Sequence, residues 1–473
     1  MRRRVKSYKF CHSLRLVCVT LYFMKKVDFE NGTITHNILQ TALPMLVAQV
    51  LNLLYSIVDR VYIGRIPGAG TEALGAVGLC FPVILLVTAF TNMFGMGGAP
   101  LFSMALGEKN REKAGKIQNT AFRLLIFCGV ILFAAGELWG RQLLLLFGSS
   151  VEELPMALSY LRIYLLGTLF IMIATGMNAY INAQGFSVIG MLSVTIGAAA
   201  NLILDPVFIF GLGLGVQGAA IATVLAQSLS FAFVLRFLLG KKNELKVSLS
   251  LDLPYAGDII SLGLAPFIMQ VTNSLVQIVC NNMLMQCGGA LYVSVMTIVS
   301  SVRSILDAPV MAIADGASPA ISYNYGAGRP DNVKKAIRVM MSLALPYTAL
   351  IWALVMLFPQ FFVRLFSEDG AILADASRAL HLYFFAFIFQ SFQYSGQTVF
   401  KALNKKRRAI FFSLFRKVIL VVPLTILLPR LFGLGTDGVF LAEPVSNVVG
   451  GLACFVTMLA TVLPELNRMK QAE

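Results

Sequence analysis

The sequence predicts an all-α polytopic membrane protein with twelve transmembrane helices, arranged as two six-helix repeats. The first observation is composition: of 473 residues, 58% are hydrophobic and 13% are charged, and the mean hydropathy is +0.78. This is too apolar for a soluble globular protein. The second is that apolar runs continue for about 20 residues or more, enough for a helix to cross a bilayer, without the alternation of an outer-membrane barrel. The third is an internal repeat.

The expected spans follow one another with short connections between them. Each is a run rich in apolar residues and bounded by polar or basic ones. The twelve spans are predicted at 36–62, 73–100, 117–139, 157–182, 187–210, 217–239, 256–284, 291–322, 334–358, 379–402, 407–429 and 438–462.

The net charge of +15 could indicate a nucleic-acid partner, but the basic residues lie in the connections between spans, where they orient a membrane protein. We therefore expect a lipid bilayer, and no nucleic acid, as partner. Even-numbered connections and the carboxy-terminal tail carry eighteen Lys and Arg residues, and the other side carries five. This asymmetry predicts cytoplasmic termini. The eighteen are Lys109, Arg111, Lys113, Lys116, Lys241, Lys242, Lys246, Arg329, Lys334, Lys335, Arg338, Lys401, Lys405, Lys406, Arg407, Arg408, Arg468 and Lys470.

Cysteine and histidine usage argues against metal centres and against most enzyme chemistry. The seven cysteines show no paired spacing, and the three histidines, His12, His36 and His381, are far apart. Neither a Cys/His metal pattern nor a histidine-based acid–base site follows from this. We expect no disulfide, no cofactor and no enzymatic activity.

Three landmarks show that the halves repeat. Residues 49–52 (QVLN) match 270–273 (QVTN), a shift of 221, and residues 213–218 (GLGVQG) match 433–438 (GLGTDG), a shift of 220. Pro100, Ser103 and Gly107 match Pro319, Ser322 and Gly326, a shift of 219. Because six spans is an even number, both halves enter from the same side, as in parallel-repeat transporters whose substrate lies between the halves.

The repeat divides the chain into five segments. The basic start, 1–23, has too short an apolar run for a span, and we treat it as an extension from a mis-assigned start codon. The segments are a cytoplasmic amino-terminal stretch at 1–35, an amino-terminal lobe at 36–240, a cytoplasmic linker at 241–258, a carboxy-terminal lobe at 259–462 and a cytoplasmic tail at 463–473.

An acidic residue, Asp205, lies within the fifth predicted span. Asn201 and Asp205 are one helical turn apart in an apolar run, so they share a helix face. A charge near the bilayer centre costs roughly 2.5–3.5 kcal/mol on insertion scales, so Asp205 needs a partner or a ligand. The alternative is that Asp205 and Pro206 end the helix at the outer surface, where water solvates the carboxylate. A second acid, Asp59 in the first span, favours an internal site.

Polar residues at helical spacing predict a central cavity. The first span carries such a face ending at Asp59, but the matching position of the seventh span is Cys280, so the second half lacks that acid. Interhelical hydrogen bonding is the alternative role for each amide. The residues expected to line a substrate cavity are Gln49, Asn52, Tyr55, Asn178, Asn182, Gln270, Asn273, Gln277, Asn281, Gln393 and Gln397.

Further charges lie at membrane depth in the second half. Arg303 and Asp307 are four residues apart on the eighth span and are expected to form an intrahelical pair. The roles of Asp315, Lys401, Arg416 and Glu443 stay open at this point.

The ordered motifs resemble the multidrug and toxic compound extrusion (MATE) family, in its bacterial MepA-like branch. They are residues 55–64 (YSIVDRVYIG), 98–103 (GAPLFS), 201–206 (NLILDP), 218–223 (GAAIAT) and 326–329 (GAGR), and Arg416 followed by Pro423. The resemblance covers about 36–462. It implies two six-helix lobes forming a V in the bacterial inner membrane. It also implies a cation site in the first lobe, made by Asp59, Asn201, Asp205 and Thr223.

The residue types at that implied site fit its chemistry. Carboxylate, amide and hydroxyl oxygens are hard ligands suited to Na⁺, and two close carboxylates can also hold a proton, so Na⁺ and H⁺ both stay open. We expect a secondary active multidrug efflux antiporter of organic, often cationic, compounds. The sequence does not specify an oligomeric state, and a monomer is the working expectation. The alternatives are a flippase of lipid-linked saccharides, which needs a strongly basic cavity, and an integral-membrane enzyme, which needs clustered His, Asp or Glu at the membrane surface.

The charge asymmetry makes the topology testable. A fluorescent protein that matures only in the cytoplasm, fused after Glu473, is expected to fluoresce because the tail lies on the basic side. A periplasm-dependent phosphatase fused at the same place is expected to be inactive, and strong phosphatase activity would refute the topology.

Overall fold

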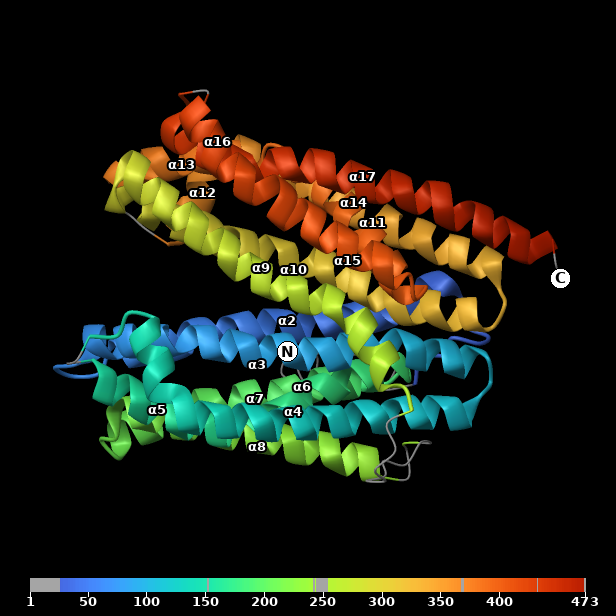
Figure 1. Ribbon diagram of the computed structural model, residues 1–473, viewed down its shortest axis with the longest axis horizontal. Coiled ribbons are helices and arrows are strands. Elements are labelled where there is room, and N and C mark those ends of the chain that lie inside the picture. The colour runs from blue at the N-terminus through green and yellow to red at the C-terminus, as the bar shows by residue number, and fades with distance from the viewer. Residues whose placement is uncertain are drawn as a thin grey trace, which may run out of the picture.

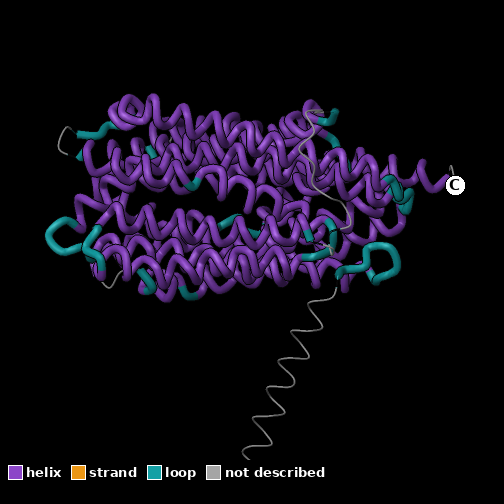
Figure 2. The backbone as a smooth tube through the Cα atoms, turned by 90° about the horizontal axis from the view of Figure 1, so that it is seen from below, coloured by secondary structure: helices purple, strands orange, loops and turns teal. Residues whose placement is uncertain are grey.

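The computed structural model describes residues 26–150, 153–240, 243, 254–366, 370–431 and 433–471, and these ranges contain helices without any strand (Figure 2). The predicted extension at 1–23 and most of the predicted linker at 241–258 lie outside the described residues.

The first half of the chain forms seven α-helices and a short π-helical segment, η1. Their bounds are α2 Ile34–Gly64, α3 Gly70–Gly107, α4 Arg111–Leu146, α5 Leu154–Leu166, α6 Thr168–Ala183, α7 Ser187–Pro206, η1 Val207–Gly211 and α8 Gly215–Leu239.

The second half follows the same order. Its bounds are α9 Ala256–Gly288, α10 Ala290–Gly326, α11 Pro330–Leu357, α12 Pro359–Arg364, α13 Gly370–Phe384, α14 Phe389–Ala402, α15 Lys406–Leu414, the π-helical η2 Phe415–Val421, α16 Val422–Leu431 and α17 Gly435–Gln471.

The described helices agree with the predicted span count when broken helices are joined. Ten helical stretches are long and apolar enough to cross a membrane, or up to twelve if each of two bent pairs is one span. The pairs are α5 with α6, bent by 52°, and α13 with α14, bent by 50°. The two bends occupy corresponding places in the two halves, so both lobes contain the same broken fourth span.

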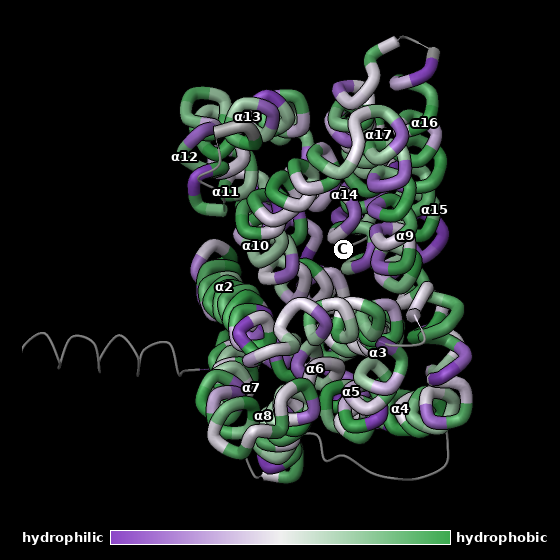
Figure 3. The backbone as a smooth tube through the Cα atoms, turned by 90° about the vertical axis from the view of Figure 1, so that its left-hand side faces the viewer, coloured by the Kyte–Doolittle hydropathy of each residue, from purple (hydrophilic) through white to green (hydrophobic). Residues whose placement is uncertain are grey.

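The helices form two lobes that lie side by side. Helices α2–α8 make the first lobe and α9–α17 the second, and the lobes diverge toward the left of Figure 1. They converge at the end that carries the α3–α4 and α10–α11 connections, which we call the basic end. Seen end on, α2 and α3 face α9 and α10 across the boundary (Figure 3). The V shape implied by the resemblance is therefore present.

Small residues bring the two backbones together at the basic end. A Cβ atom built on Gly107 of α3 would lie 2.0 Å from the Tyr323 carbonyl oxygen of α10, and one built on Gly326 would lie 2.1 Å from the Met104 carbonyl oxygen. No real side chain fits at such distances, so these glycines are required for the close approach. We call these contacts, with the two described next, the interlobe seam.

Two further contacts of the seam lie deeper along the same helices. A Cβ on Gly97 of α3 would lie 2.5 Å from the Ile259 carbonyl oxygen of α9, and one on Gly316 of α10 would lie 2.7 Å from the Ala42 Cα atom of α2. These two contacts correspond to each other in the repeat. Gly97 also lies against Gly263 of α9, and Gly97 and Gly263 are the counterparts of Gly316 and Ala42 at shifts of 219 and 221. The same interlobe contact is therefore made twice, once by each half of the repeat.

Backbone turns repeat in the same way. Ten of the eleven described residues with left-handed φ, all except Gly148, pair between the halves at shifts of 219 to 221, which follow from their positions in the sequence. One of these turns needs no glycine in the first half, since Lys109 adopts a φ of 58° where Gly328 has 70°. The pairs are Gly68 with Gly289, Lys109 with Gly328, Gly185 with Asn404, Gly213 with Gly433 and Gly215 with Gly435.

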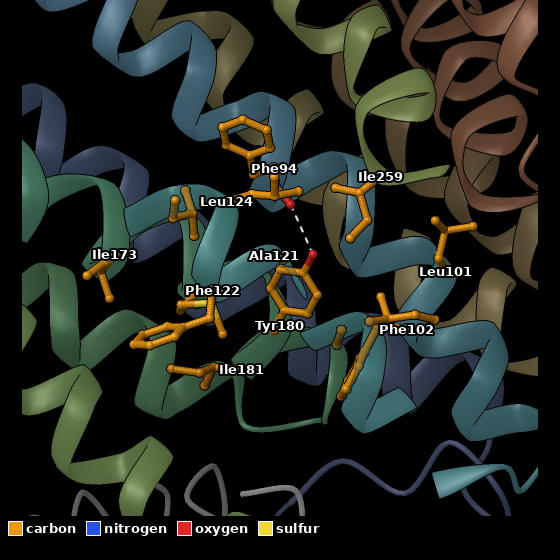
Figure 4. Packing of buried hydrophobic residues seen from close by; sticks show 14 of the residues in the cluster. Phe94, Leu101, Phe102, Ala121, Phe122, Leu124, Ile173, Tyr180, Ile181 and Ile259 are labelled. Atoms are coloured by element: carbon orange, nitrogen blue, oxygen red, sulfur yellow. Dashed lines mark hydrogen bonds between the residues drawn. The ribbon is translucent and has the colours of Figure 1, made fainter. Parts of the chain in front are cut away.

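The core of the first lobe extends into the second at the boundary. The Tyr180 hydroxyl of α6 donates to the Phe94 carbonyl oxygen of α3 at 3.0 Å, inside a cluster of buried apolar side chains (Figure 4). Ile259 and Leu262 from α9 belong to this cluster. Apolar packing therefore continues from one lobe into the other at the seam.

Two polar contacts lie beside the seam at the basic end. Glu30, just before α2, pairs with Lys109 at 2.8 Å, and its carbonyl oxygen accepts from Arg329 Nη1 at 2.6 Å. The Lys109 ammonium lowers the pKa of the Glu30 carboxyl. Because both side chains are exposed, water and salt weaken this pair. Of these two contacts only that of Arg329 joins the lobes, because Glu30 and Lys109 both belong to the first half of the chain.

Enlarging a glycine of the seam is expected to part the lobes at the basic end. In a variant whose native cysteines are replaced, Ser103→Cys reports access, because Ser103 is 1% exposed. Gly97→Leu should speed labelling of that cysteine by a water-soluble maleimide several-fold. Gly78→Leu, on the same helix with open space around its Cβ position, is the matched control and should leave labelling slow. Equal rates for both variants would contradict this account of the seam.

Candidate functional site

The end of α7 places an acid inside the first lobe. Asp205 is 0% exposed and Asn201 is 2% exposed. The helix ends at Pro206, which has no N–H to donate, and the chain continues as the π-helical η1. The alternative in which Asp205 ends the helix in water is wrong, because the protein buries this carboxylate completely.

The four residues of the expected cation site come together from three helices. Asn201 Nδ2 of α7 donates to Asp205 Oδ1 at 3.2 Å and to Thr223 Oγ1 of α8 at 3.4 Å. Asp59 of α2 lies within hydrogen-bonding reach of Asp205. We call this group the acidic pocket. The residues that the family resemblance implies for a cation site are thus brought into contact by the fold.

The acidic pocket has unused hydrogen-bonding capacity. Asp59 Oδ1 and Asp205 Oδ2 are buried and have no hydrogen-bond partner. Buried carboxylate oxygens without donors are costly. A bound cation or a shared proton would relieve that cost, whereas the described protein groups do not.

Sequence reasoning missed an aromatic wall beside the pocket. Tyr160 and Tyr164 of α5 are each 4% exposed and stack with ring centroids 6.2 Å apart. Tyr160 lies close enough to Asp59 to interact with it electrostatically, as does Tyr55 of α2. The signal available was the spacing of four residues, which puts Tyr160 and Tyr164 on one helix face.

The oxygen ligands of the acidic pocket limit which ions it can bind. Among the described residues, no group of three or more His, Cys, Asp and Glu side chains could hold a metal ion. Two carboxylates, an amide and a hydroxyl form a hard-oxygen site of low ligand charge. Such a site suits a monovalent cation or a proton better than a transition metal.

The expected cavity residues do not all face one space. Asn178 Nδ2 donates to the Gly190 carbonyl oxygen at 2.9 Å and to Ser193 Oγ at 2.8 Å, both on α7. Asn182 donates to Asn178 at 3.0 Å and also lines a small cavity between the lobes. Asn178 therefore joins α6 to α7 by hydrogen bonds, which is the alternative role considered for each amide.

The remaining amides divide between exposed and buried positions. Gln397 donates to Ser413 Oγ at 3.2 Å and lines a second small cavity. Gln393 is 4% exposed, and its Oε1 atom has no partner. Gln277 donates to Asn281 at 3.1 Å along the exposed side of α9. Asn52, Asn273 and Gln277 are exposed, whereas Gln49, Tyr55, Gln270 and Asn281 are half-buried.

The second lobe holds a buried charge network centred on Glu443 of α17. Glu443 Oε1 pairs with Arg303 Nη2 at 2.7 Å, Arg416 Nη1 at 2.9 Å and Lys417 Nζ at 3.0 Å. The expected pair between Arg303 and Asp307 is confirmed, with Nε and Oδ2 3.1 Å apart. Sequence reasoning missed Lys417 and the central role of Glu443.

A local irregularity lets two adjacent cations reach one carboxylate. Arg416 and Lys417 both lie in the π-helical η2, and both are 4% exposed. Neighbouring residues of a regular helix point about 100° apart, so a widened turn helps their side chains converge. The network supplies each buried charge with a partner and leaves none of its cations facing the acidic pocket of the other lobe.

Comparison with protein families decides the assignment. The MatE family model matches residues 44–207 and 266–427, that is, each half once. The chain belongs to the MatE family. The double match agrees with the duplication seen in the turns and in the seam.

Relatives of this MatE chain are named as transporters or export proteins. It is 25% identical over 413 residues to the multidrug export protein MepA of Staphylococcus haemolyticus, covering 86% of this chain and 89% of the relative. It is 26% identical over 425 residues to an FAD transporter of Shewanella oneidensis, covering 88% and 93% respectively. The family and the MepA-like branch expected from the sequence are thereby confirmed.

Solved structures of MATE proteins share the fold. An outward-facing multidrug resistance MATE transporter superposes with a TM-score of 0.87 at 22% identity, over 94% of this chain and 99% of the other. A transporter from Pyrococcus furiosus, described as having a binding pocket of reversed polarity, superposes with a TM-score of 0.86 at 23% identity over the same shares.

Removing the central carboxylate of the charge network is expected to destabilise the second lobe. Glu443→Ala leaves three buried cations without their shared partner, and breaking a buried pair costs about 3–5 kcal/mol. The melting temperature of the purified protein in detergent should fall clearly. Glu112→Ala removes an exposed partner of Lys116 and should leave it unchanged. Equal melting temperatures for the two variants would mean that the network contributes little.

Proposed function

We propose that the protein is a secondary active antiporter that exports bulky, often cationic, organic compounds across a bacterial inner membrane while Na⁺ or H⁺ enters. The observation that carries the proposal is the acidic pocket, with two close carboxylates whose outer oxygens lack partners. Membership of the MatE family and the multidrug export named for one relative support the substrate class.

The acidic pocket can couple an ion to a change of conformation. A gradient shifts a conformational equilibrium only when the ion binds the two states with different affinity. When Asp59 and Asp205 approach each other without a cation, their like charges repel. A proton or Na⁺ removes that repulsion, and the lobe arrangement that brings the carboxylates closest is then favoured.

Sidedness follows from the basic residues. If the basic end is cytoplasmic, the seam closes the cytoplasmic side and the lobes diverge toward the outside. The described arrangement is then the one that releases exported compounds and takes up the coupling ion. Export would require the seam to part and the outer ends to close. We further propose that one copy of the chain suffices, because each copy has both lobes.

The alternatives lack their required features among the described residues. A flippase of lipid-linked saccharides would need a strongly basic cavity, but Arg303, Arg416 and Lys417 all bind Glu443. The cation that lines the small interlobe cavities, Lys401, lies there with the acid Asp315. A membrane enzyme would need clustered acidic or histidine groups, and the part of the chain described holds no such group of three. The relatives are also named as transporters.

Neutralising the acidic pocket is expected to uncouple transport. Asp205→Asn and Asp59→Asn keep the side-chain shape but remove the charge, so each should abolish gradient-driven dye transport in liposomes while the protein still inserts. Thr223→Ala removes one neutral oxygen and should weaken dependence on the ion without eliminating transport. Imposing Na⁺ and pH gradients separately identifies the ion.

Glu72→Gln, an exposed acid at the start of α3, is the matched control for charge removal and should transport normally. Full gradient-driven transport by Asp205→Asn would exclude the acidic pocket as the coupling site, even if the protein proves to be an exporter.

A further inference from the structure

A small cavity lies between the lobes on the basic side of the molecule. The first lobe contributes Met96, Ser103 and Asn182, and the second contributes Asp315, Ser318 and Lys401. Ser103 is four residues from the end of α3, and Lys401 is one residue from the end of α14. The cavity is therefore behind the interlobe seam, and it is distinct from the acidic pocket, which uses other residues.

Two opposite charges line this cavity without a direct partner. Asp315 of α10 and Lys401 of α14 are both half-buried, and they are near enough to interact electrostatically. Within the described ranges, neither side chain has a hydrogen bond or a salt bridge to another residue. Charged groups at membrane depth are normally paired or functional. This contrasts with the Glu443 network, in which every charge is held by another.

A second cavity of the second lobe adjoins the first. It is also lined by Met96, Asp315 and Lys401, and it extends to Tyr394 and Gln397 of α14. The volumes are about 70 Å³ and about 40 Å³. These spaces hold a few water molecules but no drug-sized compound, which needs several hundred Å³. A larger ligand could reach Asp315 and Lys401 only when the seam opens.

We propose that Asp315 and Lys401 form a dipolar subsite that loads zwitterionic compounds from the side of the basic end. The inference deepens the proposed function, on which it rests, by naming a substrate class beyond simple cations. The carboxylate receives the cationic group of the ligand, and the ammonium receives its anionic group. Met96 and Tyr394 provide apolar and aromatic surface beside the charges.

The geometry favours a zwitterion over a singly charged ligand. A cation alone would pair with Asp315 but would approach the like charge of Lys401, and an anion alone would meet the reverse problem. A ligand with both charges satisfies both groups.

A pair of dyes that differ by one charge tests the subsite. Rhodamine B carries a delocalised cation and a free carboxylate at neutral pH, whereas its ethyl ester is only a cation. Binding of each dye to the purified full-length protein in detergent is measured by fluorescence anisotropy, with no ion gradient. Lys401→Gln should weaken rhodamine B binding about tenfold, the usual size for one charged hydrogen bond, and should leave or improve ester binding.

The second variant should shift selectivity the other way. Asp315→Asn should weaken binding of the ester more than binding of rhodamine B. The ratio of the rhodamine B affinity to the ester affinity should therefore fall in Lys401→Gln and rise in Asp315→Asn. Lys335→Gln, an exposed lysine on the basic side, is the matched control and should leave the ratio unchanged. Folding is checked by the melting temperature and by retained binding of the dye that each variant still prefers.

The outcomes separate this inference from the proposed function. Opposite shifts of the ratio support the subsite. An unchanged ratio in both variants, equal weakening of both dyes, or no binding of rhodamine B to the wild type overturns it. Dye binding that behaves as expected, without gradient-driven transport in liposomes, would refute the antiporter and leave the dipolar subsite standing.

Discussion

The close approach of the two lobes at the basic end is the constraint on which the other features depend. Helices in a bilayer gain little from hydrophobic burial against one another, so they associate through tight packing of small residues. Gly97, Gly107, Gly316 and Gly326 allow carbonyl oxygens of one lobe to sit where a side chain of the other would lie. Because the lobes join there and diverge elsewhere, the shape of the interlobe space is set by these contacts.

The two lobes handle buried charge in opposite ways. In the second lobe, three cations share Glu443, and Asp307 pairs with Arg303, so the charges are compensated internally. In the first lobe, Asp59 and Asp205 face each other and keep oxygens without donors. The substitution of the matching acid by Cys280 is consistent with this division. Among the described residues, the duplicated architecture thus leaves carboxylate oxygens of the first half without donors, whereas in the second half Glu443 compensates a cluster of cations and Asp315 and Lys401 line the interlobe cavities without a direct partner.

Much of the fold could be predicted from the sequence because hydropathy reports membrane spans and a repeat reports duplication. The spans and the two lobes follow from those signals, whereas the grouping of Asp205 with Asp59 and Thr223 follows from the resemblance to the MATE family. Lys401 was counted with the basic residues of a connection and also lies within the predicted span 379–402, and α14 does end at Ala402. Asn178 forms hydrogen bonds to α7 instead of facing the cavity, because its face of α6 meets α7. The helical spacing of polar residues within one span does not specify which neighbouring helix that face meets.

The same limit explains the residues that were missed. Tyr160 reaches the acidic pocket because α5 is bent against α6, and a bend of 52° is not visible in hydropathy. Lys417 pairs with Glu443 because the widened turn of the π-helical η2 brings its side chain toward that carboxylate. Local sequence composition does not predict such a turn. Sequence patterns therefore identified which helices carry polar groups, and the packing of those helices decided which groups meet.

Helix α2 touches both the acidic pocket and the seam. Asp59 lies near its carboxy-terminal end, and Ala42, seventeen residues earlier in the chain, rests against Gly316 of the other lobe. At 1.5 Å per residue, about 25 Å of continuous helix separates them. Pro44 lies at the seam end of this stretch and removes one backbone hydrogen bond of α2 there, so the helix has a weak point beside Ala42. A change in the tilt of the part that carries Asp59 can therefore be taken up next to the contact with Gly316.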